Sequence, residues 1–342
     1  MYKWVISLII LATLGIGRAL AQEVRPPALG VHILHPGEIT DAAALIKTEA
    51  NRDQWTYVTL PLSLDDLERH DEWQAAFTEA KKHRINPIVR LTSRFDPQLN
   101  AWSVPTRGEI IQLFHFLSRL EWPQDAKFII AFNEPNHASE WGGQLDPAGY
   151  AKVLNFITHW AHTEHYGYRV LPAAMDLAAP NGPDTMEAFG FLDGMLAANP
   201  HVFDNIDYWN SHSYPNPAFS ASPERTGQNS LRGYQYELAW LQEKTGLTRF
   251  VFITETGWDD NRATNSHLAS WYAIAREQIW SDTRILGVTP FVLRGDPGPF
   301  AGFTLIDRNN FATTQYEAYA AQIDLNAQNY RRYIESFQVP KF

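Results

Sequence analysis

Two glutamates occupy equivalent positions in the chain, each at the end of a short apolar run. Glu134 ends the segment FIIAFNE and is followed by Pro135, and Glu255 ends FVFITE and is followed by Thr256. A carboxylate that directly follows a buried strand points into the mouth of the fold and not into its core. Two carboxyl groups that meet there can divide a reaction between them, because one can carry a proton while the other stays ionised. The pair indicates acid–base and nucleophilic chemistry that needs no cofactor.

The separation of the two glutamates predicts that they face one another. They lie 121 residues apart, which allows about forty residues for each of three strand–helix units. Hydrolysis of a glycosidic bond with retention of configuration requires two carboxyl groups roughly 5 to 5.5 Å apart. We expect the pair to meet that requirement, although either glutamate taken alone could cap a helix or pair with an arginine.

The elements that must position this pair follow a regular order. From residue 28 onward, short apolar runs alternate with segments of helical period. The runs cover residues 29–34, 56–62, 87–93, 127–134, 168–175, 206–213, 249–255 and 285–293. The helical segments cover residues 72–84, 107–120, 147–164, 237–246, 267–280 and 313–323. This order predicts an α/β fold, a single (β/α)8 TIM barrel over residues 22–342. A doubly wound open sheet is the alternative, but no glycine-rich dinucleotide turn follows an early strand.

Polar residues gather at the ends of the predicted strands. In a (β/α)8 barrel the reacting groups lie where strands end and the following loops begin. The residues at these positions are His35, Arg90, Asn133, Glu134, Asp176, His212, Ser213, Tyr214, Glu255 and Arg294. We therefore expect a polar ring at one end of the barrel that contains both glutamates.

The N-terminus has the features of an export signal. Lys3 precedes an apolar run, and Ala19-Leu20-Ala21 precedes Gln22, which is the order of a cleavable signal peptide. We expect residues 1–21 to be a signal peptide and the protein to be secreted or periplasmic. An uncleaved membrane anchor is the alternative, because Arg18 lies close to the expected cleavage site and the run approaches the length of a membrane span.

Composition excludes several classes of function. The chain has no cysteine, so thiol catalysis and cysteine-ligated metals are excluded. Without Lys3 and Arg18 the formal net charge of −10 becomes about −12, which argues against nucleic acid or an anionic membrane as partner. His159, His162 and His165 lack carboxylate partners at fixed spacing, and metalloprotease, nucleotide-binding and serine-hydrolase motifs do not occur. We expect no metal, no cofactor, no nucleotide and a neutral substrate.

Three short motifs carry a resemblance to a known superfamily. Asn133-Glu134-Pro135 ends the fourth predicted strand, His212 and Tyr214 follow the sixth as H-x-Y, and Glu255 ends the seventh within TETGW. In this order and placement they resemble the clan A glycoside hydrolases, which carry catalytic glutamates on strands four and seven of a TIM barrel, as cellulases and mannanases do. The similarity extends through the whole barrel in order, whereas strong motif matches cover only these three segments.

The resemblance implies a role for each matching residue. Glu134 would be the acid/base and Glu255 the nucleophile. Asn133 would donate a hydrogen bond to the sugar 2-hydroxyl, Tyr214 would orient Glu255, and His212 would line the site. Capping or turn formation by Asn133 and core packing of Tyr214 are the alternatives.

The chain departs from the clan pattern at two points. Many members place an arginine at the end of strand two, whereas residues 56–62 read TYVTLPL. Arg90 on the third strand is our candidate substitute, with an ordinary ion pair as the alternative. The tryptophan that often closes strand eight is also missing, since that strand ends in FVLRG. Phe300 or Trp258 is then the candidate for the platform under the sugar.

Loop residues suggest where a sugar substrate binds. Trp141 lies in the polar segment NHASEWGG after Glu134, and Trp102 lies in the loop after the third strand. Aromatic faces pack against the C–H surfaces of sugar rings, so Trp141 is a predicted platform and Trp102 a weaker candidate. The long polar segment 214–230 is expected to shape specificity.

These observations predict a retaining glycoside hydrolase that acts on β-linked oligo- or polysaccharides. The sequence leaves two alternatives open. One is a transglycosylase that uses the same glutamates with a sugar acceptor, and the other is a barrel that binds carbohydrate without cleaving it. The presence of both glutamates favours catalysis over binding alone.

Overall fold

The computed structural model of the chain describes residues 26–164, 167–260 and 265–338. The predicted signal peptide, residues 1–21, lies outside the described residues. Within these ranges no helix has the length and apolar character needed to cross a bilayer.

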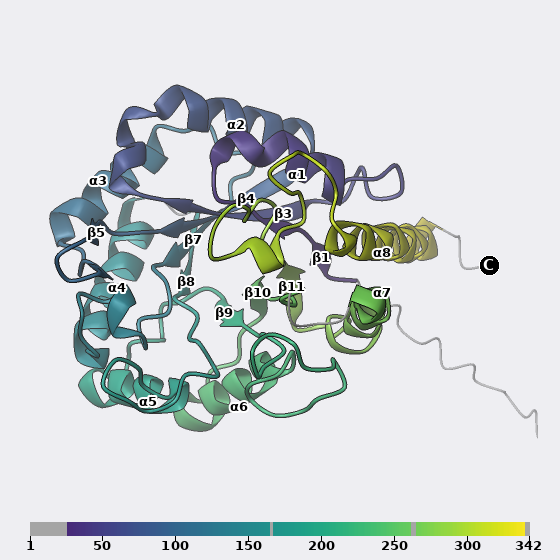
Figure 1. Cartoon of the computed structure of the whole chain (residues 1–342). Helices are drawn as coiled ribbons and strands as arrows, with labels where there is room; N and C mark the ends of the chain where they lie inside the picture. The colour runs from purple at the N-terminus through teal and green to yellow at the C-terminus, as the bar shows by residue number, and fades with distance from the viewer. Residues whose placement is uncertain (1–25, 165–166, 261–264, 339–342) are drawn as a thin grey trace, which may run out of the picture.

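Eight parallel strands follow one another around a barrel with helices outside it (Figure 1), which confirms the predicted (β/α)8 architecture. Each strand overlaps one of the predicted runs. The first strand is split into β1 (Ala28–Leu29) and β2 (Val31–His32), and the others are β3 (Thr56–Leu62), β4 (Ile85–Leu91), β7 (Lys127–Ala131), β8 (Tyr168–Pro172), β9 (Trp209–His212), β10 (Val251–Glu255) and β11 (Ile285–Val288).

Backbone pairing joins these strands into two ladders. One has the order β2-β3-β4-β7-β8 and the other β1-β11-β10-β9. The ladders meet at Gly30, between β1 and β2, where the backbone passes so close to the next strand that a Cβ atom would lie 1.9 Å from the Tyr57 carbonyl oxygen. Only glycine permits this approach. Between β8 and β9 the contact is reduced to a backbone bridge of Asp176 with His212 and a 2.9 Å hydrogen bond from the Asp207 N–H to the Val170 carbonyl.

Alternation along the strands fills both sides of the barrel wall. In β7, Ile129 and Ala131 pack outward in the large core beneath the helices, while Phe128 and Ile130 pack inward with Phe252. Burial on both faces explains why the strands read as nearly continuous apolar runs. Aromatic and aliphatic side chains such as Phe128, Ile130 and Phe252 thus fill the lower barrel.

The helices cover the outside of the barrel (Figure 1). They are α1 (Ile39–Ile46), α2 (His70–Lys82), α3 (Arg107–Ser118), α4 (Pro147–Glu164), α5 (Ala188–Ala198), α6 (Gly233–Thr245), α7 (Asn265–Ile274) and α8 (Thr314–Gln338). Short helical turns are η1 (Pro36–Glu38), η2 (Leu64–Glu68), η3 (Ala138–Glu140), η4 (Ala275–Ile279) and η5 (Ala301–Phe303). Helices α1 and α5 were not predicted. Helix α1 is only eight residues long, although its buried residues follow a helical period, and the sequence of α5, AFGFLDGMLAA, is apolar on most sides. Helix α8 continues well past its predicted end at residue 323.

The loop after β4 contains a small antiparallel hairpin. Its strands are β5 (Phe95–Asp96) and β6 (Ala101–Trp102), with Phe95 directly opposite Trp102. The hairpin lies on the side of the barrel where the strands end. Figure 1 shows it beside α3, outside the ring of strands.

Candidate active site

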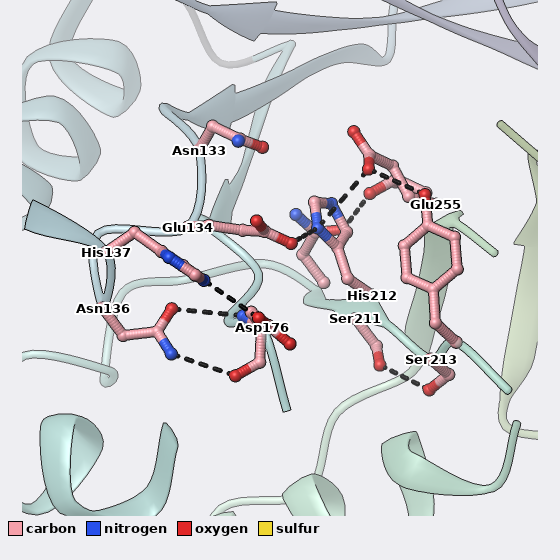
Figure 2. A network of polar contacts seen from close by, with 12 residues as sticks. Asn133, Glu134, Asn136, His137, Asp176, Ser211, His212, Ser213 and Glu255 are labelled. Atoms are coloured by element: carbon pink, nitrogen blue, oxygen red, sulfur yellow. Dashed lines mark hydrogen bonds and ion pairs between the residues drawn. The ribbon is translucent and has the colours of Figure 1, made fainter. Parts of the chain in front are cut away.

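The two predicted glutamates meet at the mouth of the barrel. One oxygen of Glu134, one oxygen of Glu255 and a ring nitrogen of His212 all lie within 4.8 Å of one another. Figure 2 shows Glu134 and Glu255 approaching from opposite sides, with His212 between them. This separation is compatible with the spacing of the carboxyl pair in retaining glycosidases, roughly 5 to 5.5 Å. The expected convergence of strands four and seven is therefore present.

Glu255 is a buried carboxylate whose two oxygens both accept hydrogen bonds. Arg90 bonds Oε1, the Tyr214 hydroxyl donates to Oε2 at 3.1 Å, and His32 Nε2 lies 3.7 Å from Oε1. Burial acts to raise the pKa of Glu255, but His212, Arg90 and His32 outweigh burial and lower the pKa to about 2. Glu255 is therefore ionised across the neutral range, as a nucleophile must be.

A shift in strand register aims Glu255 into the mouth. The pairing of β10 with β9 changes between Ile253 and Glu255. The neighbouring residue, Thr254, also faces the interior, since its hydroxyl donates to the Asn210 side chain at 2.6 Å. In a regular strand two successive side chains would point to opposite faces, and an irregularity of this kind re-aims one of them.

Glu134 is the more open of the two carboxyl groups. Its side chain is 22% exposed, against 10% for Glu255. The backbone leaves β7 through positive φ angles at Phe132 (72°) and Glu134 (25°), a conformation that non-glycine residues adopt rarely and mostly at functional sites. This turn brings Glu134 Oε1 to 2.7 Å from His212 Nδ1. The setting suits a group that must exchange protons with substrate and water.

His212 connects the two glutamates from the end of β9. Its Nδ1 bonds Glu134 and lies 3.7 Å from Glu255 Oε2. Burial acts to lower the pKa of His212, but the nearby Glu255 and Glu134 raise it above its usual value. Tyr214, two residues further on, has a pKa raised well above its usual value by burial and by both glutamates. Tyr214 therefore keeps its proton and acts as a donor to Glu255.

A third carboxyl group, Glu140 at the end of η3, faces the same network. Arg90 donates to the Asn133 side-chain oxygen at 2.8 Å, and the Asn133 side chain is also hydrogen-bonded to Glu140. Burial and the charge of Glu134 raise the pKa of Glu140 to about 7. Asn133 thus connects Arg90, beside Glu255, to Glu140, beside Glu134.

His137 and Asp176 form a second pair next to Glu134 (Figure 2), with His137 Nε2 2.9 Å from an Asp176 carboxylate oxygen. The hydrogen bond with Asp176 raises the pKa of His137, with burial opposing and Glu134 adding to the rise. Two side-chain hydrogen bonds from Asn136 hold the Asp176 backbone and the neighbouring loop, through the carbonyls of Asp176 and Met186. The pair places an imidazole of raised pKa beside Glu134.

Glu134, His212 and Glu255 could also supply three ligand atoms to a metal ion. Both oxygens of Glu255 already accept bonds from Arg90 and Tyr214, and the guanidinium charge opposes a second cation at the same carboxylate. The donor set therefore fits proton transfer and nucleophilic attack better than metal binding.

No family model matches the chain, and the curated proteins include no match. Solved structures do match. A family 39 glycoside hydrolase from Bacteroides cellulosilyticus WH2 is 18% identical, with a TM-score of 0.57 over 89% of this chain and 64% of its own. An endo-β-1,4-glucanase from Xanthomonas axonopodis pv. citri is 13% identical, with a TM-score of 0.57 over 90% and 99%. An endo-1,4-β-mannanase from Rhizomucor miehei is 12% identical, with a TM-score of 0.55 over 89% and 95%.

The chain shares the TIM-barrel fold of these glycoside hydrolases. It spans about two thirds of the Bacteroides protein and nearly all of the mannanase and the glucanase.

Within this fold, Arg90 comes from the third strand and contacts both Glu255 and Asn133. It is thus close enough to Glu255 for the substitution that we expected, and its role there stays a prediction.

Two predicted sugar platforms are wrong, because both rings are buried. Trp141 packs edge-on against Tyr150 of α4 and lies near Phe132. Trp258 packs against Trp271 and Tyr272 of α7, and its indole N–H donates to the Ala221 carbonyl at 2.9 Å. Both loops fold back onto helices, so neither ring offers a face to a ligand.

The predictions for Phe300 and His35 have different outcomes. Phe300 is 42% exposed and lies edge-on to Phe291, with ring centroids 5.0 Å apart, so its platform role stays a prediction. His35 is exposed at the start of η1, where its backbone N–H donates to Glu38. No contact among the described residues joins His35 to either glutamate.

Four residues at the site were not predicted, namely His32, Phe291, His137 and Glu140. His32 is a buried residue of β2 whose Nε2 approaches Glu255, and Phe291, just after β11, lies 5.0 Å from the His32 ring. A histidine inside the apolar run LGVHIL was a signal for the first. An aromatic residue in FVLRG, close to where the clan pattern has tryptophan, was a signal for the second.

Proposed function

We propose that the protein is a retaining glycoside hydrolase that cleaves β-linked oligo- or polysaccharides by double displacement. The observation that supports this most directly is the approach of Glu134 and Glu255 to within 4.8 Å, with Glu255 held ionised by Arg90 and Tyr214. An ionised carboxylate beside a more open one is the arrangement this reaction requires.

The proposed reaction has two balanced steps. A Glu255 oxygen attacks the anomeric carbon, the bond to the leaving oxygen breaks, and Glu134 gives that oxygen its proton, so that a glycosyl ester forms on Glu255. Glu134, now a carboxylate, takes a proton from water as the water oxygen attacks the same carbon. The ester bond breaks and Glu255 returns to its ionised form. Configuration is inverted twice and so retained.

The proposal extends to export and domain organisation. Removal of residues 1–21 would leave residues 22–342 as one catalytic domain that acts outside the cytoplasm. The names of the glucanase and the mannanase with the same fold state that these enzymes act on β-1,4-linked glycans. β-1,4-Glucans and mannans are therefore the first substrates to test.

A panel of plant, fungal and bacterial polysaccharides tests the function. We expect new reducing ends on at least one β-linked polymer, with product sizes that distinguish internal from terminal attack. Proton NMR of the first products should show the β-anomer before mutarotation. First products in the α-configuration would contradict the retaining mechanism, transfer products without net hydrolysis would indicate a transglycosylase, and binding without any product would indicate a carbohydrate-binding barrel.

Arg90→Met should make Glu255 a weaker nucleophile at low pH, because less of this carboxyl group is then ionised. Because the folded pKa of Glu255 is depressed to about 2, ionised Glu255 stabilises the fold above its unfolded pKa of about 4.3, and this contribution is lost as pH falls through the folded value. Loss of the guanidinium raises the pKa of Glu255. We expect the acidic limb of kcat/KM to move to higher pH, with a loss of about 10²-fold at neutral pH.

The same variant should be less stable at neutral pH by about 3 to 5 kcal/mol, because a buried carboxylate loses its partner. This deficit should shrink at low pH, where protonation removes the uncompensated charge. Chemical denaturation at pH 7 and pH 4 measures it, and Arg52→Met, at an exposed arginine paired with Glu49, is the control. An unmoved acidic limb would remove Arg90 from the mechanism.

A further inference from the structure

The hairpin β5–β6 exposes apolar side chains that its own packing does not require. Phe95 is 48% exposed and Leu99 58% exposed, and Trp102 is half-buried. The ladder is two residues long on each strand, and so short a ladder adds little stability. Exposed apolar groups gathered in one place are typical of a binding surface.

The two aromatic rings of the hairpin are held in a fixed arrangement. Phe95 and Trp102 are direct cross-strand partners, and their rings meet edge to face with centroids 5.6 Å apart. The Ser103 N–H donates to the Arg94 carbonyl at 2.8 Å, which closes the ladder behind them. A fixed aromatic pair loses little conformational entropy when a ligand binds, which suits a platform.

The hairpin is joined directly to the loop that carries the acid/base side of the site. The Gly142 N–H donates to the Trp102 carbonyl at 2.6 Å. Gly142 has a φ of +65°, and a Cβ atom there would lie 2.8 Å from Val104 Cγ2. Gly142 follows Glu140 by two residues, and Glu140 faces Glu134. The hairpin is therefore attached to the loop that carries Glu140.

The chemistry around the rings favours a neutral, hydroxyl-rich ligand. Polar side chains are interspersed with the exposed apolar ones along residues 94–104, at Asp96, Gln98, Asn100 and Ser103. The segment's charges, Arg94 and Asp96, balance one another. A sugar ring combines an apolar C–H face with a rim of hydroxyl groups, which matches this alternation.

We propose that the hairpin of residues 94–104 is a distal carbohydrate subsite in which Phe95 and Trp102 hold sugar units several residues away from the cleaved bond. This inference rests on the proposed function and deepens it, because a subsite outside the ring of strands is useful only for a chain longer than a disaccharide. The substrate would then be an extended β-linked glycan.

Kinetics with substrates of increasing length test the subsite. The probes are a short activated aryl glycoside and oligosaccharides of two to six units from the polymer that the panel identifies. In the wild-type protein the ratio of kcat/KM for the longest oligosaccharide to that for the aryl glycoside should be high. In Trp102→Leu, which keeps apolar bulk against the loop, and in Phe95→Ala, this ratio should fall about tenfold, the equivalent of one lost ring contact. Trp102→Phe should restore most of it.

The matched control is Phe250→Ala. Phe250 is 53% exposed but directly precedes β10, at the opposite end of the barrel, so this variant should leave the ratio unchanged. Equal ratios in wild-type, Trp102→Leu and Phe95→Ala proteins would overturn the subsite while leaving the hydrolase intact. A dimer in size-exclusion chromatography that Phe95→Ala dissociates would also overturn it, in favour of a self-association surface.

Binding without turnover separates the subsite from the proposed function. Affinity electrophoresis of the full chain in gels that contain each polysaccharide of the panel requires no catalysis. Retardation that Trp102→Leu reduces would support the subsite even if no polymer were cleaved. Retardation of equal size in the wild-type and Trp102→Leu proteins would contradict the subsite.

Discussion

Glu255→Ala is expected to abolish turnover, with kcat falling roughly 10⁴-fold to 10⁶-fold. Alanine cannot form the glycosyl ester, and water that enters the vacated space is a weak nucleophile when no base activates it. The chain should stay folded, although the loss of a partner for Arg90 lowers its stability. Circular dichroism and a thermal melt establish the fold, and turnover of an aryl glycoside establishes the defect.

Added azide tests whether the defect of Glu255→Ala lies in the loss of the nucleophile. The truncated side chain leaves space at the face that the carboxylate occupied, and azide can attack the anomeric carbon from there. A β-glycoside should then yield the α-glycosyl azide, with inverted configuration. Glu38→Gln is a matched control, because Glu38 is also a buried carboxyl group after a strand but bonds the His35 backbone. Unchanged activity in Glu255→Ala would remove Glu255 from the mechanism.

The loss of kcat/KM in Glu134→Gln is expected to depend on the leaving group of the substrate. Glutamine keeps the shape and the contact with His212 but has no proton to give. Substrates with poor leaving groups should lose about 10²-fold to 10⁴-fold in kcat/KM, the usual contribution of a general acid. Activated aryl glycosides depart without protonation, so their first step should be nearly unaffected.

A series of aryl glycosides with leaving groups of graded acidity measures this difference. In the wild-type protein the rate should depend weakly on the leaving group, and in Glu134→Gln the dependence should be steep. Equal losses along the whole series would argue against the acid role and would favour a merely structural contribution from Glu134.

The strand ends were predictable because their signal is periodic and local. Eight apolar runs in a helical background predict a barrel, and a barrel places every strand end at one mouth. Glu134, His212, Tyr214 and Glu255 could therefore be brought together before any coordinates were known. Arg90 was predicted as a substitute for a missing arginine, and it contacts Glu255.

The loop aromatics were not predictable in the same way. Trp141 and Trp258 lie in polar, glycine-bearing segments, which suggested exposed platforms. Their burial depends on where those segments fold, against Tyr150 in one case and Tyr272 in the other. Nothing in the local sequence specifies which helix a loop will contact.

His32 and Phe291 were missed for other reasons. His32 lies within a short apolar run, where a single histidine is usually a satisfied core residue. Its approach to Glu255 arises from the closure of the barrel, which brings the first strand beside the eighth and close to the seventh. Phe291 was missed because a platform of tryptophan was expected and a phenylalanine was not considered at that position.

The way the two ladders divide the chain constrains the order in which the barrel can assemble. The ladder from β2 to β8 uses residues 31–172 and can pair as soon as that length has emerged from the ribosome. The strand β1, although it emerges first, pairs with β11 and waits until residue 288 is available. The strand β1 is thus among the last parts of the barrel to find its place, and a nascent chain halted before β11 would present an open edge to chaperones.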